Sequence, residues 1–366
     1  MAQAPVRKTG LWRSDPSPHL MNTPQSHINN TLQACSRYSL SDDEIKNIQE
    51  HGIEEFIYSK LASKKFRKSK LQQTCEIRTK KAIDICVKHN KPIHVVYFTG
   101  GYKLWRFPTS PEADWAEFFN IAHVLRYIAP IAAAYKSGVT ISYYIHTLLM
   151  EKHDNLTIEE IEKYINSFQM IINAFLKFTP LNISIKIWKD ADLYGRSEYF
   201  PILEKGYNEA EKLFLAMTEA QKNHYLKLGR LNIKWDGKED WTKLSPAEKE
   251  EKVRQGAIWE LAATSNLSRI HLTAKGEDKI LLFTFNTPAF IGIGSTQGSV
   301  VKHWTGFGVL EQDGEIYRER ILSPSQFEKV KNDIHTVIPT YLLPLKNLES
   351  VWVYPQPFNF THPEEM

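Results

Sequence analysis

The sequence of 366 residues is poor in cysteine and contains no long apolar segment. Its three cysteines, Cys35, Cys75 and Cys86, include no Cys-x-x-Cys pair, and an odd number cannot all pair as disulfides. No apolar run approaches the roughly 20 residues that a membrane-spanning helix requires. The N-terminus lacks the basic segment followed by an apolar one that marks a secretory signal. We therefore expect a cytoplasmic protein without a membrane segment.

Several motifs that define enzyme classes are also absent. The chain has no Gly-x-Ser-x-Gly nucleophile turn, no Gly-x-Gly-x-x-Gly and no phosphate-binding P-loop. His146, His153 and Asp154 lie close together in sequence, but without the compact spacing of a His-Glu-x-x-His metal site. We therefore expect neither a bound metal nor a cofactor.

Composition is that of a globular protein rich in aromatic residues: 42% hydrophobic, 24% charged and 12% aromatic. Residues 1–38 are rich in Pro, Ser, Asn and His and show no periodicity, which predicts a flexible N-terminal arm. Residues 39–366 are long enough to bury a large core as one α/β catalytic domain, with a sub-boundary near residue 265.

The order of apolar patterns predicts the fold class. Short β-branched and aromatic runs at 93–98, 139–145 and 181–188 read as strands. Helix signals lie between them, at Ser110-Pro111, for a helix running towards Ile128 with Pro130 as a break or kink, and at Thr157-Ile158-Glu159-Glu160. Alternation of strand and helix predicts a Rossmann-like, mainly parallel sheet with helices on both faces.

The remaining segments divide into helical and strand-rich parts. A capping box at Ser41-Asp42-Asp43-Glu44 predicts a helix to about residue 59, and residues 60–91 continue as a basic helix. Residues 201–264 look helical. The C-terminal part is expected to be more antiparallel, with an Asp313-Gly314 hairpin and a helix from Ser323, and with short strands at 269–273, 279–285, 306–310, 315–322 and 351–354.

The segment from Val95 to Glu117 carries the strongest indication of a site. A buried strand runs into Gly100-Gly101, where the backbone can turn and approach a ligand. Lys103 and Arg106 follow, and both suit a phosphate or carboxylate. The helix start at Ser110-Pro111 would add its N-terminus to an anion site. The alternative is a solvated turn whose cations pair with Glu112 and Asp114.

Asp114 and Glu117 are three residues apart and share one helical face. Together they could bind an ammonium group, or one of them could act as a base. Alternatively, Glu112 and Asp114 are first-turn charges that favour the helix without a chemical role.

Two further histidines are candidate acids or bases. Arg269 and His271 alternate on one face of an expected strand, where they could bind an anion and move a proton, or form a surface pair. His303 follows the glycine-rich residues 294–299, in a loop of the kind that covers a site, or in a mobile surface loop.

The net charge of +4 is mild, but basic residues are concentrated at 60–81. This basic helix could engage nucleic acid or another acidic partner, which is the non-catalytic alternative for the whole protein. Basic solvated helix faces are common and only Phe66 adds an aromatic ring there, so small-molecule substrates are expected rather than nucleic acid or membranes.

The layout resembles the isocyanide (isonitrile) synthase family, whose members start pyoverdine-cluster and spore-wall dityrosine pathways. The resemblance is carried by Phe98 to Lys103, by Ala113-Asp114-Trp115-Ala116-Glu117, by Val139–Ile145 and by Arg269-Ile270-His271. Differences from the family pattern lie at Ala113 instead of proline, at Thr287-Pro288-Ala289-Phe290 instead of Thr-Pro-Trp-His, and at Ser142-Tyr143-Tyr144, which lacks a Ser-Asp-Gly.

The resemblance implies a biosynthetic enzyme of secondary metabolism with carbon–nitrogen lyase or transferase chemistry. Such an enzyme would convert the amino group of an aromatic L-amino acid to an isonitrile, with a carbon from ribulose 5-phosphate. Lys103 and Arg269 would bind phosphate or carbonyl groups, and Lys103 could form a Schiff base. Asp114, Glu117 and His271 would hold the amino group or move protons. An unrelated α/β enzyme with a phosphate-bearing substrate at Gly100-Gly101 is the other enzymatic alternative.

Overall fold

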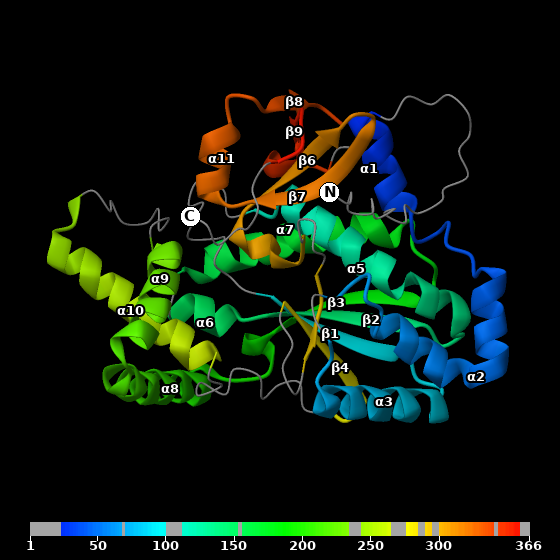
Figure 1. Ribbon diagram of the computed structural model, residues 1–366, viewed down its shortest axis with the longest axis horizontal. Helices are drawn as coiled ribbons and strands as arrows, with labels where there is room; N and C mark the ends of the chain where they lie inside the picture. Colours follow the sequence, from blue (N-terminus) through cyan, green and yellow to red (C-terminus); the bar gives the residue numbers. More distant parts are fainter. Residues whose placement is uncertain are drawn as a thin grey trace, which may run out of the picture.

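A five-stranded parallel sheet forms the centre of the protein in the computed structural model (Figure 1). The structure describes residues 23–67, 70–99, 112–152, 156–233, 243–264, 276–284, 290–294, 300–339 and 343–358. The strands follow the order β3-β2-β1-β4-β5, and every pairing between neighbours is parallel. They are β1 (Ile93–Thr99), β2 (Val139–Ile145), β3 (Ile183–Lys189), β4 (Lys279–Phe283) and β5 (Ile291–Gly292). The α/β class with helices flanking a parallel sheet is confirmed.

The two central strands form as their sequences predict. Strand β1 pairs with β2 along its whole length, from Ile93 opposite Val139 to Thr99 opposite Ile145. Six of the seven residues in each strand are buried. Continuous β-branched and aromatic runs are typical of parallel strands that are covered on both faces.

Strand β4 corrects one sequence-based expectation. The segment 279–285 was expected in the antiparallel C-terminal part, but Lys279–Phe283 pairs in parallel with β1. Its apolar residues Ile280 and Leu282 join the same core cluster as Val95 and Tyr97 of β1. Burial beside β1 explains this placement, because periodicity shows that a strand exists but not which strand it pairs with.

Helix α5 (Trp115–Ala134) lies between the parallel sheet and the second sheet (Figure 1). It is apolar around most of its circumference, as expected for a helix covered on all sides. At its start it approaches the second sheet so closely that a Cβ on Gly308 would lie 2.2 Å from the carbonyl carbon of Trp115. The expected break at Pro130 does not occur, since the helix continues to Ala134 within this packing.

The start of α5 also differs from the expectation. Ser110 and Pro111 lie outside the described residues, and the N-cap is Asp114. Glu112 and Asp114 therefore precede the helix and are not first-turn residues. The Asp114 side chain accepts from the Ala116 amide, and Glu117 returns a contact to the Asp114 amide, which completes a capping box.

The basic segment is not one helix. Helix α2 (Asp42–Leu61) ends at the start of this segment, and helix α3 (Gln73–Lys88) begins twelve residues after Leu61. Between them the Arg67 guanidinium donates to the Ala62 carbonyl, at 2.8 Å from Nε, and so stabilises a turn. The break lets the apolar faces of both helices reach the core, whereas one straight helix could not bury both.

Part of the expected N-terminal arm is ordered. Residues Pro24–Gln33 form helix α1, with Thr23 as its N-cap. Ile28 and Leu32 are buried in the main core. A helix of ten residues shows too little periodicity to be recognised in the sequence. Packing against the rest of the protein stabilises it. Residues 1–22 lie outside the described residues.

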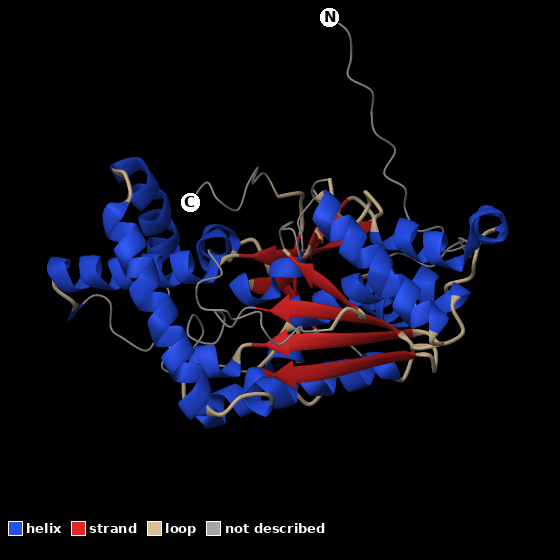
Figure 2. Ribbon diagram, turned by 90° about the horizontal axis from the view of Figure 1, so that it is seen from below, coloured by secondary structure: helices blue, strands red, loops and turns tan. Residues whose placement is uncertain are grey.

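The other helices flank the sheet or lie beyond the carboxyl ends of its strands (Figure 2). Helix α7 packs on β3, and helices α8 to α10 confirm the expected helical middle segment. Their bounds are α6 (Thr147–Lys152), α7 (Ile158–Leu176), α8 (Arg196–Ala216), α9 (Glu219–Ile233) and α10 (Pro246–Thr264), with the short 3-10 helix η1 (Asp190–Asp192) after β3. Among the described residues, none of the helices is both long and apolar enough to span a bilayer.

The C-terminal part forms a second, mixed sheet of order β7-β6-β9-β8. The expected hairpin is present: β6 pairs antiparallel with β7, and Gly314 adopts a φ of 61° in the turn. Leu310 and Val353 of this sheet belong to the same core cluster as Val95 of β1. The elements are η4 (Val300–Thr305), β6 (Phe307–Asp313), β7 (Ile316–Leu322), α11 (Pro324–Val330), β8 (His335–Val337), η5 (Lys346–Leu348) and β9 (Val351–Tyr354).

Candidate functional site

The strand order identifies one edge of the parallel sheet as the natural ligand site. From β1 the chain continues to β2 and β3 on one side, whereas β4 and β5 lie on the other. Ligands of open α/β sheets bind at such a reversal, outside the carboxyl ends of the strands. Thr99 ends β1 at this point. The expected anion-binding residues Gly100, Gly101, Lys103 and Arg106 follow it in sequence but lie outside the described residues, as do Arg269 and His271.

Asp114 and Glu117 are brought together, as expected, at the N-terminus of α5. Glu117 Oε2 accepts the Asp114 amide at 2.7 Å, and Asp114 Oδ1 accepts the Ala116 amide at 2.6 Å. Glu117 Oε1 also accepts from the Tyr164 hydroxyl at 3.3 Å. Both carboxylates are buried, Glu117 completely. These contacts give both groups a structural role as a helix cap, and a catalytic role stays a prediction.

Tyr164 is kept neutral by this arrangement. Burial raises the pKa of its hydroxyl well above the usual value, and the nearby Glu117 carboxylate raises it further. The neutral Tyr164 hydroxyl donates a hydrogen bond to the Glu117 carboxylate. The Glu117–Tyr164 pair is therefore a fully buried hydrogen bond to a charged group, the kind whose loss is most costly.

His303 lies in the 3-10 helix η4 and is buried, so it does not belong to a mobile surface loop. Its ring centroid is 5.8 Å from that of Phe168 and 6.4 Å from that of Tyr97. The Tyr97 hydroxyl donates to the Val301 carbonyl, and Asn120 of α5 donates to the Val300 carbonyl at 3.0 Å. Helix α5 therefore carries Glu117 and, through Asn120, also holds the backbone of the segment that contains His303.

A second cluster of polar groups lies at the carboxyl ends of β2 and β3. The last residues of the two strands, Ile145 and Lys189, pair with each other. His146 directly follows β2 and Asp190 directly follows β3. The His146 Nδ1 lies 4.0 Å from Asp190 Oδ2. The Thr147 hydroxyl and the Leu148 amide donate to Asp190 Oδ1 at 2.6 and 2.8 Å. The imidazole packs edge-on against Tyr144, with the ring centroids 4.8 Å apart.

Asp190 is completely buried, and burial raises the pKa of its carboxyl to about 6, although the hydrogen bonds from Thr147 and neighbouring amides oppose the shift. Tyr199 of α8 faces it: burial, and then the Asp190 charge, raise the pKa of the Tyr199 hydroxyl far above its usual value. A carboxyl that titrates near neutrality at a strand end is typical of functional sites.

The raised pKa predicts how stability depends on pH. The pKa of the Asp190 carboxyl is about 6 in the folded protein, compared with 3.8 in the unfolded chain. The neutral carboxyl therefore contributes stability to the folded protein. This contribution is fully present below pH 3.8 and is lost as the pH rises through 6. A two-unit difference is worth roughly 3 kcal/mol, and an amide recovers part of it. We expect Asp190→Asn to raise the free energy of unfolding by about 1–2 kcal/mol at pH 8, with a smaller gain at pH 4.

Urea denaturation of both forms at pH 4 and pH 8 measures this difference, and a gain that does not grow with pH would contradict it. The same comparison on a His146→Gln background removes any contribution from the neighbouring imidazole, which lies 4.0 Å from Asp190.

Sequence reasoning considered His146 only as a metal ligand and did not single out Asp190. A signal was nevertheless available, because His146 directly follows the predicted strand 139–145 and Asp190 lies two residues beyond the predicted strand 181–188. Among the described residues, no group of three or more His, Cys, Asp or Glu side chains could hold a metal ion.

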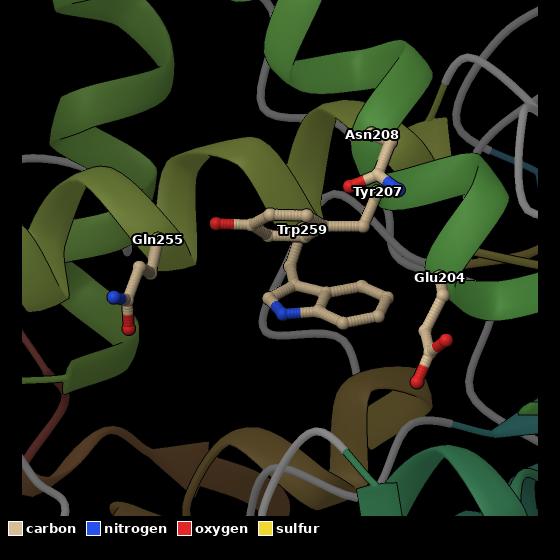
Figure 3. A pocket seen from close by; sticks show the side chains of 5 residues that line it. All are labelled: Glu204, Tyr207, Asn208, Gln255 and Trp259. Atoms are coloured by element: carbon tan, nitrogen blue, oxygen red, sulfur yellow. The ribbon is translucent and has the colours of Figure 1, made fainter.

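A separate pocket of about 470 Å³ lies between α8 and α10 (Figure 3). It is lined by Glu204, Tyr207, Asn208, Gln255 and Trp259. The rings of Tyr207 and Trp259 are 4.9 Å apart, and Glu204 is paired with Lys152 of α6 at 2.7 Å. The pocket is open and its carboxylate already has a cation, so it is a weaker candidate than the sheet edge.

The basic segment carries less uncompensated charge than its sequence indicates. Lys80 pairs with Glu76 at 3.2 Å, and Lys81 pairs with Glu277 at 2.6 Å. At its start, Lys60 pairs with Glu44. These contacts favour a structural explanation for part of the basic segment.

The fold and the strand-end cluster define an α/β protein with its candidate site at the carboxyl edge of a parallel sheet. No protein-family model and no curated protein matches the sequence. The chain is similar in structure to the PvcA protein from Pseudomonas aeruginosa, with a TM-score of 0.55. The match covers 90% of this chain and 99% of that chain, at 14% sequence identity. The two proteins therefore share a fold.

Proposed function

We propose that this protein is a biosynthetic enzyme distantly related to isocyanide synthases. It would convert the amino group of an L-amino acid to an isonitrile, with the added carbon taken from ribulose 5-phosphate. One observation carries the proposal: the chain shares its fold with PvcA, an isocyanide-synthase-type protein, over 90% of its length. The order of the sequence motifs, from Phe98 to Lys103, Ala113 to Glu117 and Arg269 to His271, resembles this family and supports the same proposal.

The site residues follow from that proposal. Gly100, Gly101 and Arg106 would hold the sugar phosphate after β1, with Arg269 as a second cation, and Lys103 would engage its carbonyl group. His271 and His303 are the proposed acids or bases from the C-terminal half. Asp114 and Glu117 would hold the amino group or move protons, in addition to capping α5.

A mass-resolved assay tests the reaction. Purified protein is incubated with a pool of L-amino acids, with and without ribulose 5-phosphate. We expect a product that forms only with the sugar phosphate. Its formula should contain one carbon more and two hydrogens fewer than that of one of the amino acids. The Lys103→Ala variant should lose this product while its circular dichroism spectrum stays unchanged.

The absence of such a product from folded protein would overturn this reaction. The strand reversal beside β1 favours a second candidate in that event: another α/β enzyme with a phosphate-bearing substrate. That candidate predicts a rise in melting temperature with ribulose 5-phosphate or a related sugar phosphate, and loss of the rise in Arg106→Ala.

A further inference from the structure

We propose that His146 accepts a proton from the amino group of the substrate and that Asp190 is a positioning residue that holds the imidazole for this step. The proposal rests on the proposed function for its substrate, an amino acid. It assigns a role to two residues at the carboxyl edge of the sheet that the resemblance to isocyanide synthases did not identify.

The orientation of Asp190 is fixed by its neighbours. Thr147 and the Leu148 amide hold Oδ1. Oδ2 lies 4.0 Å from His146 Nδ1, and the Tyr199 hydroxyl interacts with the same carboxyl group. This separation exceeds a hydrogen bond, and catalytic contacts of this kind often tighten only when substrate binds. A fully buried carboxylate would thus face one nitrogen of an imidazole that is 7% exposed.

Aromatic rings fix the imidazole from both sides. The ring of Phe98 is stacked on it with the centroids 6.2 Å apart, and Tyr144 contacts it edge-on. Phe98 belongs to β1, which leads directly to the Gly100-Gly101 segment. Apolar surroundings exclude water, so the Asp190 charge acts strongly on the imidazole.

The proton transfer is balanced within the site. The amino group of an amino acid is an ammonium ion near neutral pH, and its nitrogen must lose one proton before it can attack a carbonyl carbon. The nitrogen–hydrogen bond breaks, its electron pair stays on the substrate nitrogen, and the proton bonds to His146. Nε2 is the nitrogen on the side of the ring away from Asp190, and the carboxylate stabilises the imidazolium that forms.

Among the described residues, tyrosines and charged side chains also lie near the His146–Asp190 pair. Tyr144 of β2 lies beside His146, Tyr194 follows η1, and Tyr199 belongs to α8; the Asp190 charge acts on both Tyr194 and Tyr199. The charged neighbours on its own segment, Lys189 and Asp192, pair with each other at 3.6 Å. Tyr194 and Tyr199 remain neutral near pH 7 because burial raises the pKa of both hydroxyls.

Titration of the histidine ring protons by NMR tests the pair without any substrate. The His146 signal is assigned as the one that His146→Gln removes. We expect Asp190→Asn to lower the titration midpoint of His146 by about one pH unit or more, because the carboxylate that stabilises the imidazolium is gone. An unchanged midpoint would overturn the positioning role.

Two further variants make this result specific. Thr147→Val removes one hydrogen bond to Asp190 and should lower the midpoint by less than Asp190→Asn does. His94→Gln is the matched control: His94 lies near the amino end of β1, bonded to Ser142, and its loss should leave the His146 midpoint unchanged.

Turnover then tests the proton transfer itself. If the wild type forms isonitrile, we expect His146→Gln to lower kcat about 100-fold or more, and Asp190→Asn to shift the acidic limb of the pH profile by the amount measured by NMR. Full activity of His146→Gln would refute the role of His146. If the wild type forms no isonitrile, the proposed function fails, while the NMR result still decides whether Asp190 acts on His146.

Discussion

Replacing Arg126 with methionine is expected to lower the free energy of unfolding by about 3 kcal/mol at pH 7. Arg126 of α5 donates to Glu319 of β7 through both terminal nitrogens of its guanidinium group, Nη1 at 3.1 Å from Oε2 and Nη2 to Oε1. His27 and Thr31 of α1 contact the same carboxylate. One ion pair thus joins three elements that are far apart in sequence. Its loss leaves a largely buried carboxylate without its cation.

The charge of Glu319 depends on this pair. Burial alone would raise the pKa of its carboxyl, but Arg126 and then His27 lower it well below the usual 4.5. A lowered pKa means that the stabilisation is present above pH 4.5 and is lost as the pH falls further. The difference between wild type and Arg126→Met should therefore shrink in acid.

An exposed pair provides the control. Lys46 and Glu50 lie 3.7 Å apart on α2 with side chains 71% and 53% exposed, compared with 19% and 14% for Arg126 and Glu319. We expect Lys46→Met to change stability by less than about 0.5 kcal/mol. Urea denaturation measures both variants. Equal, small losses would show that the buried pair contributes no more than a surface one.

Replacing Glu117 with alanine should also lower the free energy of unfolding, by about 3 kcal/mol. The change leaves two buried donors, the Asp114 amide and the Tyr164 hydroxyl, without their acceptor. Tyr164→Phe should lose less, because it removes one contact and leaves the cap intact. A double-mutant cycle between the two positions measures their coupling.

Helix α7 offers a matched control for this prediction. Glu160 occupies the same capping-box position, where it accepts the Thr157 amide at 2.8 Å, but the box is exposed to solvent. Glu160→Ala should therefore cost about 1 kcal/mol or less. If Glu117→Ala were no more destabilising, and Glu117→Gln abolished turnover in fully stable protein, the residue would be a catalyst rather than a cap.

Local patterns in the sequence determined much of the fold. Strands β1 and β2, the start of α7 at Thr157 and the hairpin at Gly314 were predicted, because periodicity, caps and turn residues act within a few positions. Two helix-start signals compete before α5, at Ser110-Pro111 and at Asp114-x-x-Glu117. In the described structure the helix begins after Asp114, and Glu117 in its first turn is buried and accepts a hydrogen bond from Tyr164.

The sequence by itself determined that this is an α/β protein whose first and second strands are short apolar runs, since those signals are local. Only the tertiary structure decided that β4 joins the parallel sheet and that His146 faces Asp190. The latter pair is 44 residues apart, and it forms because β2 and β3 align Ile145 with Lys189. Strand register depends on which surfaces can be buried together, and no single segment of sequence contains that information.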